Sequence, residues 1–210
     1  MAGAEVTRER PAEKRLTIFA TEFPAIPTNE AARTYDKRFG VKFTVKTGPV
    51  DTWLPKVRGG EGDIIAVGAE YIMDDIQSED LVIEETRATV GYRRSVIIVR
   101  RGNPKGIRSL QDLTVEGVRL LIAIGGCQKG LWDDVASKVM LTDKIRKHIV
   151  QHGKGCADTL RLWRATKDTV DASIVWNVYK NIAPEDCDAI ELPESIRVMR
   201  STNVAIIKSS

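Results

Sequence analysis

The chain has 210 residues, of which 42% are hydrophobic and 29% charged, and this balance excludes a collagen-like or disordered chain. Its 32 basic and 29 acidic side chains leave a net charge of +3, too small an excess to indicate nucleic acid as a partner. No apolar run approaches the ~20 residues that span a bilayer. The length favours one domain, or two small ones that share a core.

Residues 1–14 are polar and lack the apolar stretch of a secretory signal peptide, so we expect a flexible leader there. The three cysteines, Cys127, Cys156 and Cys187, are too few and too widely spaced for a disulfide framework. At most one bridge can form, and the cysteine count leaves the redox compartment undecided.

In the first half of the chain, apolar segments alternate with amphipathic ones from Leu16 onward. We expect strands over 16–20, 41–45 and 63–67, and helices over 28–38, 51–57 and 70–76. The first helix has apolar residues at helical spacing, and Gly40 is placed to end it.

The second half repeats this alternation. It predicts strands over 95–100, 118–124, 172–176 and 204–208. Helices are expected over 130–140, from Thr142 to His152 with Gly153 ending it, and over 157–165. The alternating order predicts an open α/β fold with parallel sheets.

Few residues in the sequence have the chemistry of catalysis or metal binding. The patterns GxSxG, HExxH and Walker A do not occur. His148, His152 and Cys156 have a spacing that suits zinc, but Gly153 would break the helix between them, so a solvated helix end is favoured and no metal site is expected. Cys127 precedes a helix start that would lower its pKa, which makes it the one plausible nucleophile if the protein is an enzyme.

Four strand-to-helix junctions, at 20–28, 47–53, 68–71 and 128–132, carry Gly, Thr or Ser. Such junctions lie at the carboxyl ends of the strands, where ligands bind, and free N–H groups at helix starts suit anions. The alternative is ordinary capping of the helices. Trp53 and Trp132 fall at these starts, so we expect them to face a cleft, whereas Trp163 is expected in the core and Trp176 in either place.

Five segments in collinear order resemble the accessory colonization factor C family, which belongs to the periplasmic solute-binding proteins of the sulfate/molybdate type. They are TGPVDTW (47–53), DIIAVGAEYIMDD (63–75), YRRSVIIVRRGNPKGI (92–107), QKGLWDD (128–134) and IVWNVY (174–179).

The resemblance implies the type II periplasmic binding fold, with two Rossmann-like α/β lobes joined by crossover strands at 95–100 and 204–208. Lobe one would comprise 15–94 plus 200–210, and lobe two 95–199. The family continues with C-terminal helices that pack on lobe one and that are missing from this chain. Either the chain is truncated, or lobe one exposes an apolar surface that a homo-oligomer or a swapped element would cover.

The resemblance also implies that both lobes contribute ligand contacts. Arg93 would grip an oxyanion as a fork, with an interlobe salt bridge to Glu70 as an equal alternative. The first loop contains Glu22 where the family is rich in glycine, and together with Glu70 it would also suit a ligand with an ammonium group or a metal. The expected ligand-binding residues are Thr21, Glu22, Gly48, Thr52, Trp53, Gly68, Ala69, Glu70, Arg93, Ser95, Gln128, Gly130, Leu131, Trp132, Trp176 and Asn177.

We therefore expect a solute-binding protein without catalysis or cofactor that captures a small anion for a membrane transporter or a chemoreceptor. A sulfate-like or molybdate-like oxyanion comes first, and a small organic anion second. The resemblance implies a periplasmic or extracellular location. The alternatives are a sensor or adhesion module of the same fold, and an enzyme that uses Cys127.

Overall fold

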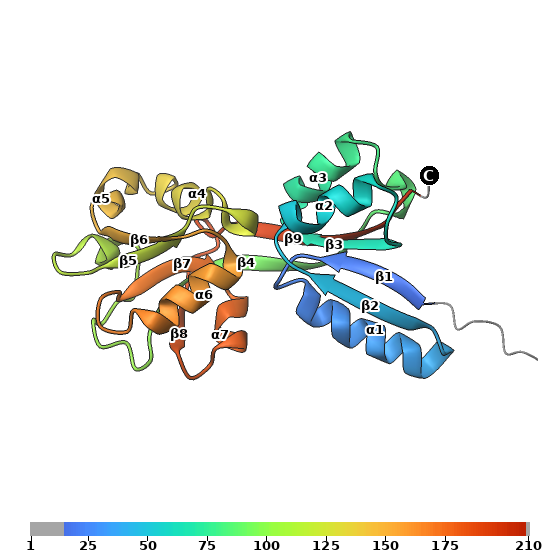
Figure 1. The fold of residues 1–210 in the computed structure, drawn as a ribbon. Coiled ribbons are helices and arrows are strands. Elements are labelled where there is room, and N and C mark those ends of the chain that lie inside the picture. The colour runs from blue at the N-terminus through green and yellow to red at the C-terminus, as the bar shows by residue number, and fades with distance from the viewer. Residues whose placement is uncertain (1–14, 209–210) are drawn as a thin grey trace, which may run out of the picture.

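The computed structural model describes residues 15–208, which form two α/β lobes side by side (Figure 1). Lobe one contains β1 (Arg15–Ala20), α1 (Ala25–Phe39), β2 (Lys42–Thr47), α2 (Val50–Arg58), β3 (Ile64–Gly68), α3 (Glu70–Ser78), the short helix η1 (Glu84–Thr86) and β9 (Met199–Ile206). Lobe two contains η2 (Gln111–Thr114), β5 (Leu120–Ala123), η3 (Gly126–Gln128), α4 (Leu131–Ser137), α5 (Thr142–Arg146), β6 (Ile149–Gly153), α6 (Cys156–Ala165), β7 (Ala172–Trp176), α7 (Val178–Ile182) and β8 (Cys187–Glu191). Strand β4 (Ala88–Arg100) runs through both lobes.

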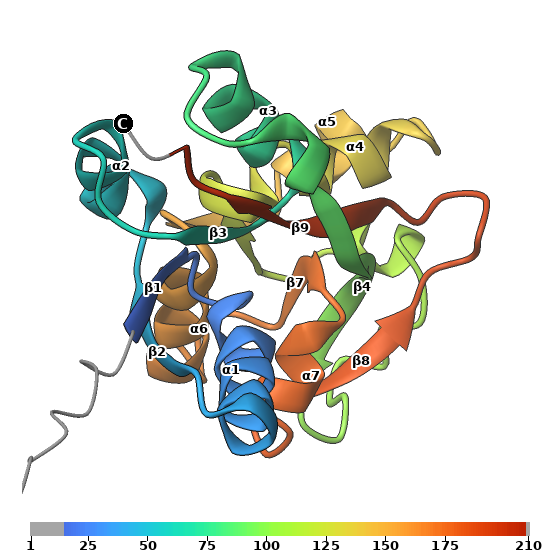
Figure 2. The ribbon, with the colours of Figure 1, turned by 90° about the vertical axis from the view of Figure 1, so that its right-hand side faces the viewer.

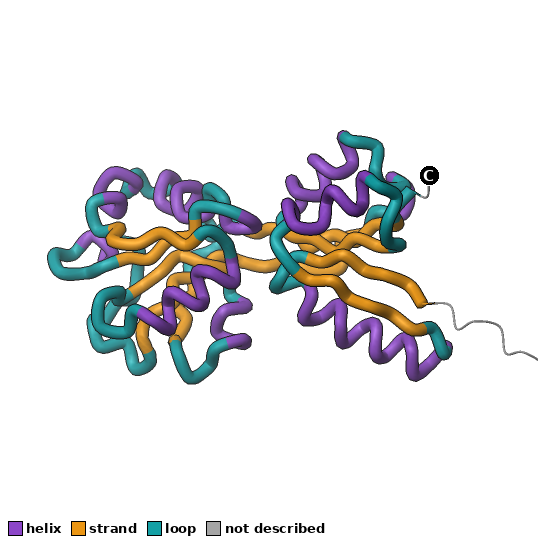
Figure 3. Tube along the Cα trace, in the orientation of Figure 1, coloured by secondary structure: helices purple, strands orange, loops and turns teal. Residues whose placement is uncertain are grey.

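The strands of the described chain form one mixed sheet in the order β2-β1-β3-β9-β4-β7-β5-β6, with β8 also paired to β4 (Figure 3). Within the lobes, β1 is parallel to β2 and β3, and β5 is parallel to β6 and β7. Strands β4 and β9 run antiparallel to their neighbours. The predicted fold of two α/β lobes joined by crossover strands is confirmed, but the sheets are not purely parallel.

The lobes meet at β4, whose two halves pair with different strands. Residues 88–94 pair with β9, and residues 95–100 pair with β7 and β8. The second connection runs into β9, which begins five residues before the predicted strand because it pairs with both β3 and β4. Ser95 joins the two connections, since its N–H donates to the Val198 carbonyl at 2.8 Å and its Oγ accepts from the Val198 N–H at 2.8 Å. The lobe boundaries at 94/95 and 199/200 stay a prediction.

Two segments of lobe two differ from the prediction. The helix expected to run to His152 ends at Arg146, and β6 follows in parallel pairing with β5. Ile149 and Val150 are β-branched and favour a strand, so sheet pairing overrides the helical spacing of the histidines. Strand β8 was not predicted, and it is held by its antiparallel pairing with β4.

The helices cover the sheet of lobe one unevenly. Helices α2 and α3 lie on one side and α1 on the other (Figure 2). One hydrophobic core runs through both lobes, and it includes Trp163, as predicted, and Trp176, both with no exposed surface. Within residues 15–208, no helix is long and apolar enough to cross a membrane.

Candidate functional site

Arg93 lies in β4, in the stretch that joins the two lobes, and is buried with only 5% of its surface exposed. Its three guanidinium nitrogens have no hydrogen-bond partner within residues 15–208. Burial lowers the pKa of Arg93 to about 10, which leaves it charged at neutral pH. A buried charge without partners is costly, so this group is poised to receive an anion.

The guanidinium lies against the carboxyl end of β3, where α3 begins. A Cβ added to Gly68 would come within 2.2 Å of Arg93 Nη2, so only glycine leaves room for the arginine there. Across the junction, the guanidinium carbon lies 5.2 Å from the centroid of the Trp176 ring at the end of β7. Arg93 therefore lies between the carboxyl ends of one strand from each lobe, the place where ligands bind in α/β sheets.

Two tyrosines lie near Arg93, one from each lobe. The charge of Glu70 opposes the lowering of the arginine's pKa most, and Tyr71 and Tyr179 also oppose it. Tyr71, from α3, donates through its Oη to the Gly126 carbonyl of lobe two at 2.5 Å. Phe23 of lobe one meets Tyr179 edge to face, with ring centroids 5.0 Å apart. We call Gly68, Tyr71, Arg93, Trp176 and Tyr179 the interlobe junction.

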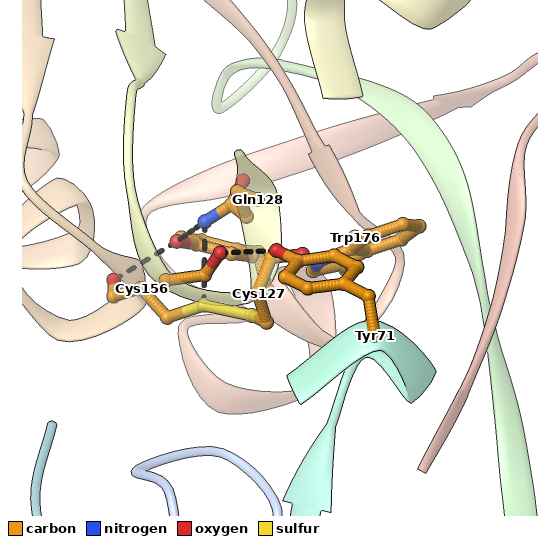
Figure 4. Close-up of a disulfide and its surroundings, with 7 residues drawn as sticks. Tyr71, Cys127, Gln128, Cys156 and Trp176 are labelled. Atoms are coloured by element: carbon orange, nitrogen blue, oxygen red, sulfur yellow. Dashed lines mark hydrogen bonds between the residues drawn. A yellow bond between two sulfur atoms is a disulfide. The ribbon is translucent and has the colours of Figure 1, made fainter. Parts of the chain in front are cut away.

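A disulfide between Cys127 and Cys156 lies on the lobe-two side of this junction (Figure 4). Gln128, next to it, is buried and donates through Nε2 to Tyr179 Oη at 2.5 Å, while its Oε1 has no partner among the described residues. The bridge uses two of the three cysteines, and Cys187 is a free, buried thiol. Cys127 is thus not a free nucleophile, which corrects the sequence-based hypothesis.

Glu70 does not form the salt bridge with Arg93 that was the alternative prediction. Its carboxylate is 3.4 Å from Arg200 Nη1 and accepts the Ser201 N–H at 2.9 Å. Arg200 also contacts Asp134 of lobe two at 2.9 Å, so this pair of bridges links the lobes. The Glu70 carboxylate is therefore bound by Arg200 and Ser201 of β9, and the Arg93 guanidinium is left without a hydrogen-bonding carboxylate among the described residues.

Glu22 follows β1 and faces lobe two. Burial raises the pKa of its carboxyl, and a hydrogen bond from the backbone N–H of Ala157, in the first turn of α6, opposes that shift. A carboxylate of the chain itself thus lies at a helix start that favours anions. Thr21, beside it, is buried, and its Oγ1 has no partner in the described part of the chain.

The tryptophans predicted to face a cleft are core residues, and that interpretation was wrong. Trp53 is buried, stacks on Phe19 at 5.7 Å and donates from Nε1 to the Gly48 carbonyl at 3.0 Å. Trp132 is also buried, and the guanidinium of Arg146 lies 5.4 Å from its ring centroid. A tryptophan at a helix start can fold back under the helix, so its position in the sequence does not fix its direction.

The remaining predicted residues have structural contacts of their own. Thr52 Oγ1 donates to the Pro49 carbonyl at 2.6 Å, within the turn that follows β2. Asn177 Oδ1 accepts the Arg94 N–H at 3.1 Å and so fixes the end of β7 to β4. Ala69 and Leu131 are buried, and Gly130 has a φ of 74° at the start of α4. The ligand contacts predicted for these five residues and for Ser95 stay predictions.

Sequence reasoning did not select three residues that shape the junction: Tyr71, Tyr179 and Arg200. Tyr71 and Tyr179 do lie inside the family-like segments 63–75 and 174–179. Each comes shortly after the carboxyl end of a strand, a position that would have signalled them. Within residues 15–208, no group of three or more His, Cys, Asp or Glu side chains could hold a metal ion, and His148 and His152 do not form one.

A cavity of about 860 Å³ lies on the α1 side of lobe one, runs along the sheet beside residues such as Ile18 and Val204, and is mostly apolar. It reaches the interlobe junction, because Arg93 and three residues of α7 in lobe two also line it. Ile26 and Tyr35 from α1 and Tyr92 from β4 line it and are about half or more exposed. The exposed apolar surface predicted on lobe one is thus present.

The fold and the junction define a type II periplasmic binding architecture, with two lobes and a buried charged group between them. The chain belongs to the bacterial extracellular solute-binding protein family, whose model matches residues 16–210. Members of this family bind small ligands outside the cytoplasm and deliver them to membrane transporters. No match is found among curated protein sequences.

Solved structures of similar fold share little sequence with this chain. Peb3 from Campylobacter jejuni is 22% identical, with a TM-score of 0.77 over 93% of this chain and 88% of that chain. The sulfate-binding protein SubI from Mycobacterium tuberculosis is 15% identical, with a TM-score of 0.77 over 94% and 77%. The molybdate-binding protein from Azotobacter vinelandii is 15% identical, with a TM-score of 0.69 over 93% and 86%. At such identities the likeness establishes the fold alone.

Proposed function

We propose that this protein captures a small anion at the interlobe junction and presents it to a membrane transporter or a chemoreceptor. The observation that carries the proposal is the guanidinium of Arg93, which is charged, buried and without a hydrogen-bond partner in the described chain. An oxyanion would accept charge-assisted hydrogen bonds from it, and these are about twice as strong as neutral ones. Its position between two strand ends is where the fold binds ligands.

The ligand class is a sulfate-like or molybdate-like oxyanion, or a small organic anion that carries one such group. Structural relatives support this choice: two are named for sulfate and molybdate, and another, a PEB3 structure at 22% identity and a TM-score of 0.82, holds L-phospholactate. Glu22 would disfavour a highly charged anion, so a ligand with one anionic group and a hydrogen-bond donor fits the junction well. The five sequence segments described above support membership of the accessory colonization factor C group and a periplasmic location.

A thermal-shift screen tests the proposal. The probes are sulfate, molybdate, phosphate, L-phospholactate and acetate, each against the parent protein and against Arg93→Met. An anion that binds only the folded state stabilises it by RT ln(1 + [L]/Kd), about 2.7 kcal/mol at a hundredfold excess over Kd. We expect at least one probe to raise the Tm of the parent and not that of the variant. No shift with any probe would favour the alternative of a sensor or adhesion module, and equal shifts would remove Arg93 from the site.

A homo-oligomer that covers the lobe-one cavity was expected from the sequence and stays a prediction. Sedimentation velocity of the parent and of Tyr92→Lys measures it directly. A dimer that the lysine dissociates would support a second copy as the occupant. A monomer in both cases would contradict it.

A further inference from the structure

The Cys127–Cys156 disulfide joins two loops that face the other lobe. Cys127 lies in η3, after β5, and Cys156 begins α6, after β6. Because β5 and β6 are parallel neighbours, both loops emerge at the same edge of the sheet. The bridge therefore connects two lobe-two loops at the edge of the sheet where β7 ends in Trp176, a residue of the interlobe junction.

The two loops lie close together beside this bridge, and at Gly125 they leave no room for a side chain. A Cβ on Gly125 would lie 2.3 Å from the Lys154 carbonyl oxygen, and a Cβ on Gly126 would lie 3.7 Å from the Gly155 Cα. The backbones thus approach each other directly, and the cross-link holds them at that separation.

Hydrogen bonds connect Tyr179 with Cys156 and with Gln128, the residue beside the disulfide. Tyr179 Oη donates to the Cys156 carbonyl at 2.9 Å. Its single proton is thereby used, so Oη accepts from Gln128 Nε2 at 2.5 Å. This fixes the orientation of the Gln128 amide and leaves Oε1 as a buried acceptor without a partner in the described chain.

Two further contacts tie the same turn to both sides of the binding site. Tyr71 of lobe one donates to the Gly126 carbonyl at 2.5 Å, and Trp176 Nε1 donates to the Cys127 carbonyl at 3.2 Å (Figure 4). The Trp176 ring is the one that lies against the Arg93 guanidinium. The turn 126–128 therefore contacts the aromatic partner of the proposed anion-binding group and the tyrosine that bridges the lobes.

We propose that the Cys127–Cys156 disulfide is a positioning element of the ligand site, an inference that rests on the proposed function. The bridge holds the turn 126–128 so that its carbonyls receive Tyr71 and Trp176 in the geometry that closes the lobes around Arg93. A site held in its binding geometry before the ligand arrives binds more tightly, because less order is lost on binding. Loss of the bridge lowers affinity in a protein that is still folded.

The test compares the double variant C127A/C156A with two controls in lobe two. Cys187→Ala removes the free buried thiol, and Leu113→Ala destabilises the core away from the junction. The affinity for the best of the screened anions is measured by titration calorimetry, well below the lowest Tm of the set. We expect binding about tenfold weaker in the double variant and unchanged in both controls. Equal affinity in the double variant and the parent would overturn the inference, and a loss in Leu113→Ala would assign the effect to stability instead.

Amide hydrogen exchange of the ligand-free proteins separates this inference from the proposed function. If no probe anion binds the parent, the proposed function fails, and exchange alone decides the role of the bridge. We expect faster exchange in the double variant within 125–130, 154–158 and the start of α3 at Tyr71, with 172–176 still protected. Unchanged exchange near Tyr71 would overturn the inference, because the bridge would then not reach the other lobe.

Discussion

Strand β4 carries two arginines with similar surroundings and opposite hydrogen bonding. Each lies over a tryptophan, Arg93 at 5.2 Å from Trp176 and Arg100 at 3.7 Å from Trp163, and burial lowers the pKa of both. Arg100 donates to three carbonyl oxygens, those of Val170 at 2.7 Å, Trp163 at 2.7 Å and Thr166 at 2.6 Å. Arg93 donates to none within the described residues.

The difference separates a structural arginine from a binding one. Each guanidinium nitrogen of Arg100 donates to a carbonyl of lobe two, and these charge-assisted hydrogen bonds stabilise the fold. Arg93 has the same chemistry without acceptors, at the place where the lobes meet. Its N–H groups can form hydrogen bonds only when a ligand supplies the acceptor oxygens, which is the property expected of a ligand-binding group.

Arg93→Met should remove the proposed anion-binding group and have the largest effect of the variants. We expect anion affinity to fall at least about 100-fold, as two or more charged hydrogen bonds are lost. The folded pKa of about 10 lies below the ordinary value of an arginine, so the unfolded chain binds this proton more tightly and the charge destabilises the ligand-free fold at neutral pH. Removing it should therefore raise the free energy of unfolding by about 1–3 kcal/mol in the absence of ligand.

Titration calorimetry measures the affinity of Arg93→Met, and urea unfolding measures its stability. Arg93→Lys is the matched control, because it keeps the charge and loses the planar fork. Unchanged affinity in Arg93→Met would show that the anion binds elsewhere.

Arg100→Met should show the opposite pattern. Three partly buried carbonyls would lose their donor, and the free energy of unfolding should fall by about 2–4 kcal/mol. Anion affinity, measured at a temperature where the variant is folded, should stay that of the parent. A stability loss below about 1 kcal/mol would mean that water replaces the guanidinium, and that the contrast between the two arginines is smaller than their contacts indicate.

Tyr71→Phe tests whether the hydrogen bond from Tyr71 to lobe two holds the lobes together. The variant loses only the hydrogen bond to the Gly126 carbonyl, so the lobes should separate more easily and affinity should fall about 3- to 10-fold. Small-angle scattering of the ligand-free protein should show a larger radius of gyration. An unchanged radius together with unchanged affinity would contradict a bridging role for this tyrosine.

Glu22 should make anion binding depend weakly on pH. Its raised pKa means that the folded state binds this proton more tightly than the unfolded chain, so its negative charge destabilises the fold at neutral pH. That penalty disappears as the pH falls through the raised pKa, and protonation also removes a negative charge near the anion. We expect affinity for a fully ionised probe such as sulfate to rise a few-fold as the pH falls through the raised pKa, and Glu22→Gln to bind as tightly at pH 7 as the parent does once Glu22 is protonated. A parent and variant with the same pH profile would place Glu22 outside the site.

The lobe architecture could be predicted because strand and helix periods are local properties of the sequence. The family-like segments added the crossover connections, which no local pattern shows. The errors came where pairing decides the conformation: Ile149 and Val150 are strand residues because β5 lies beside them, and β8 exists because β4 offers it an edge.

The sequence indicated which positions lie near the candidate site, but it did not indicate the direction in which their side chains point. Arg93 was singled out from the family-like pattern, and its ligand role stays a prediction, but its burial and lack of partners required the three-dimensional packing. Trp53 was misjudged for the same reason, since its ring turns back to stack on Phe19. The pairing of Cys127 with Cys156 depends on β5 and β6 being neighbours, and β6 was predicted as a helix.

A crystal structure of the protein with the anion that gives the largest thermal shift would show directly whether Arg93 binds the ligand. We expect the anion between the lobes, with oxygens within about 3 Å of the Arg93 guanidinium nitrogens, and Arg100 still bound to its three carbonyls. An anion bound elsewhere, with Arg93 unpaired or donating to a group of the chain itself, would contradict this expectation.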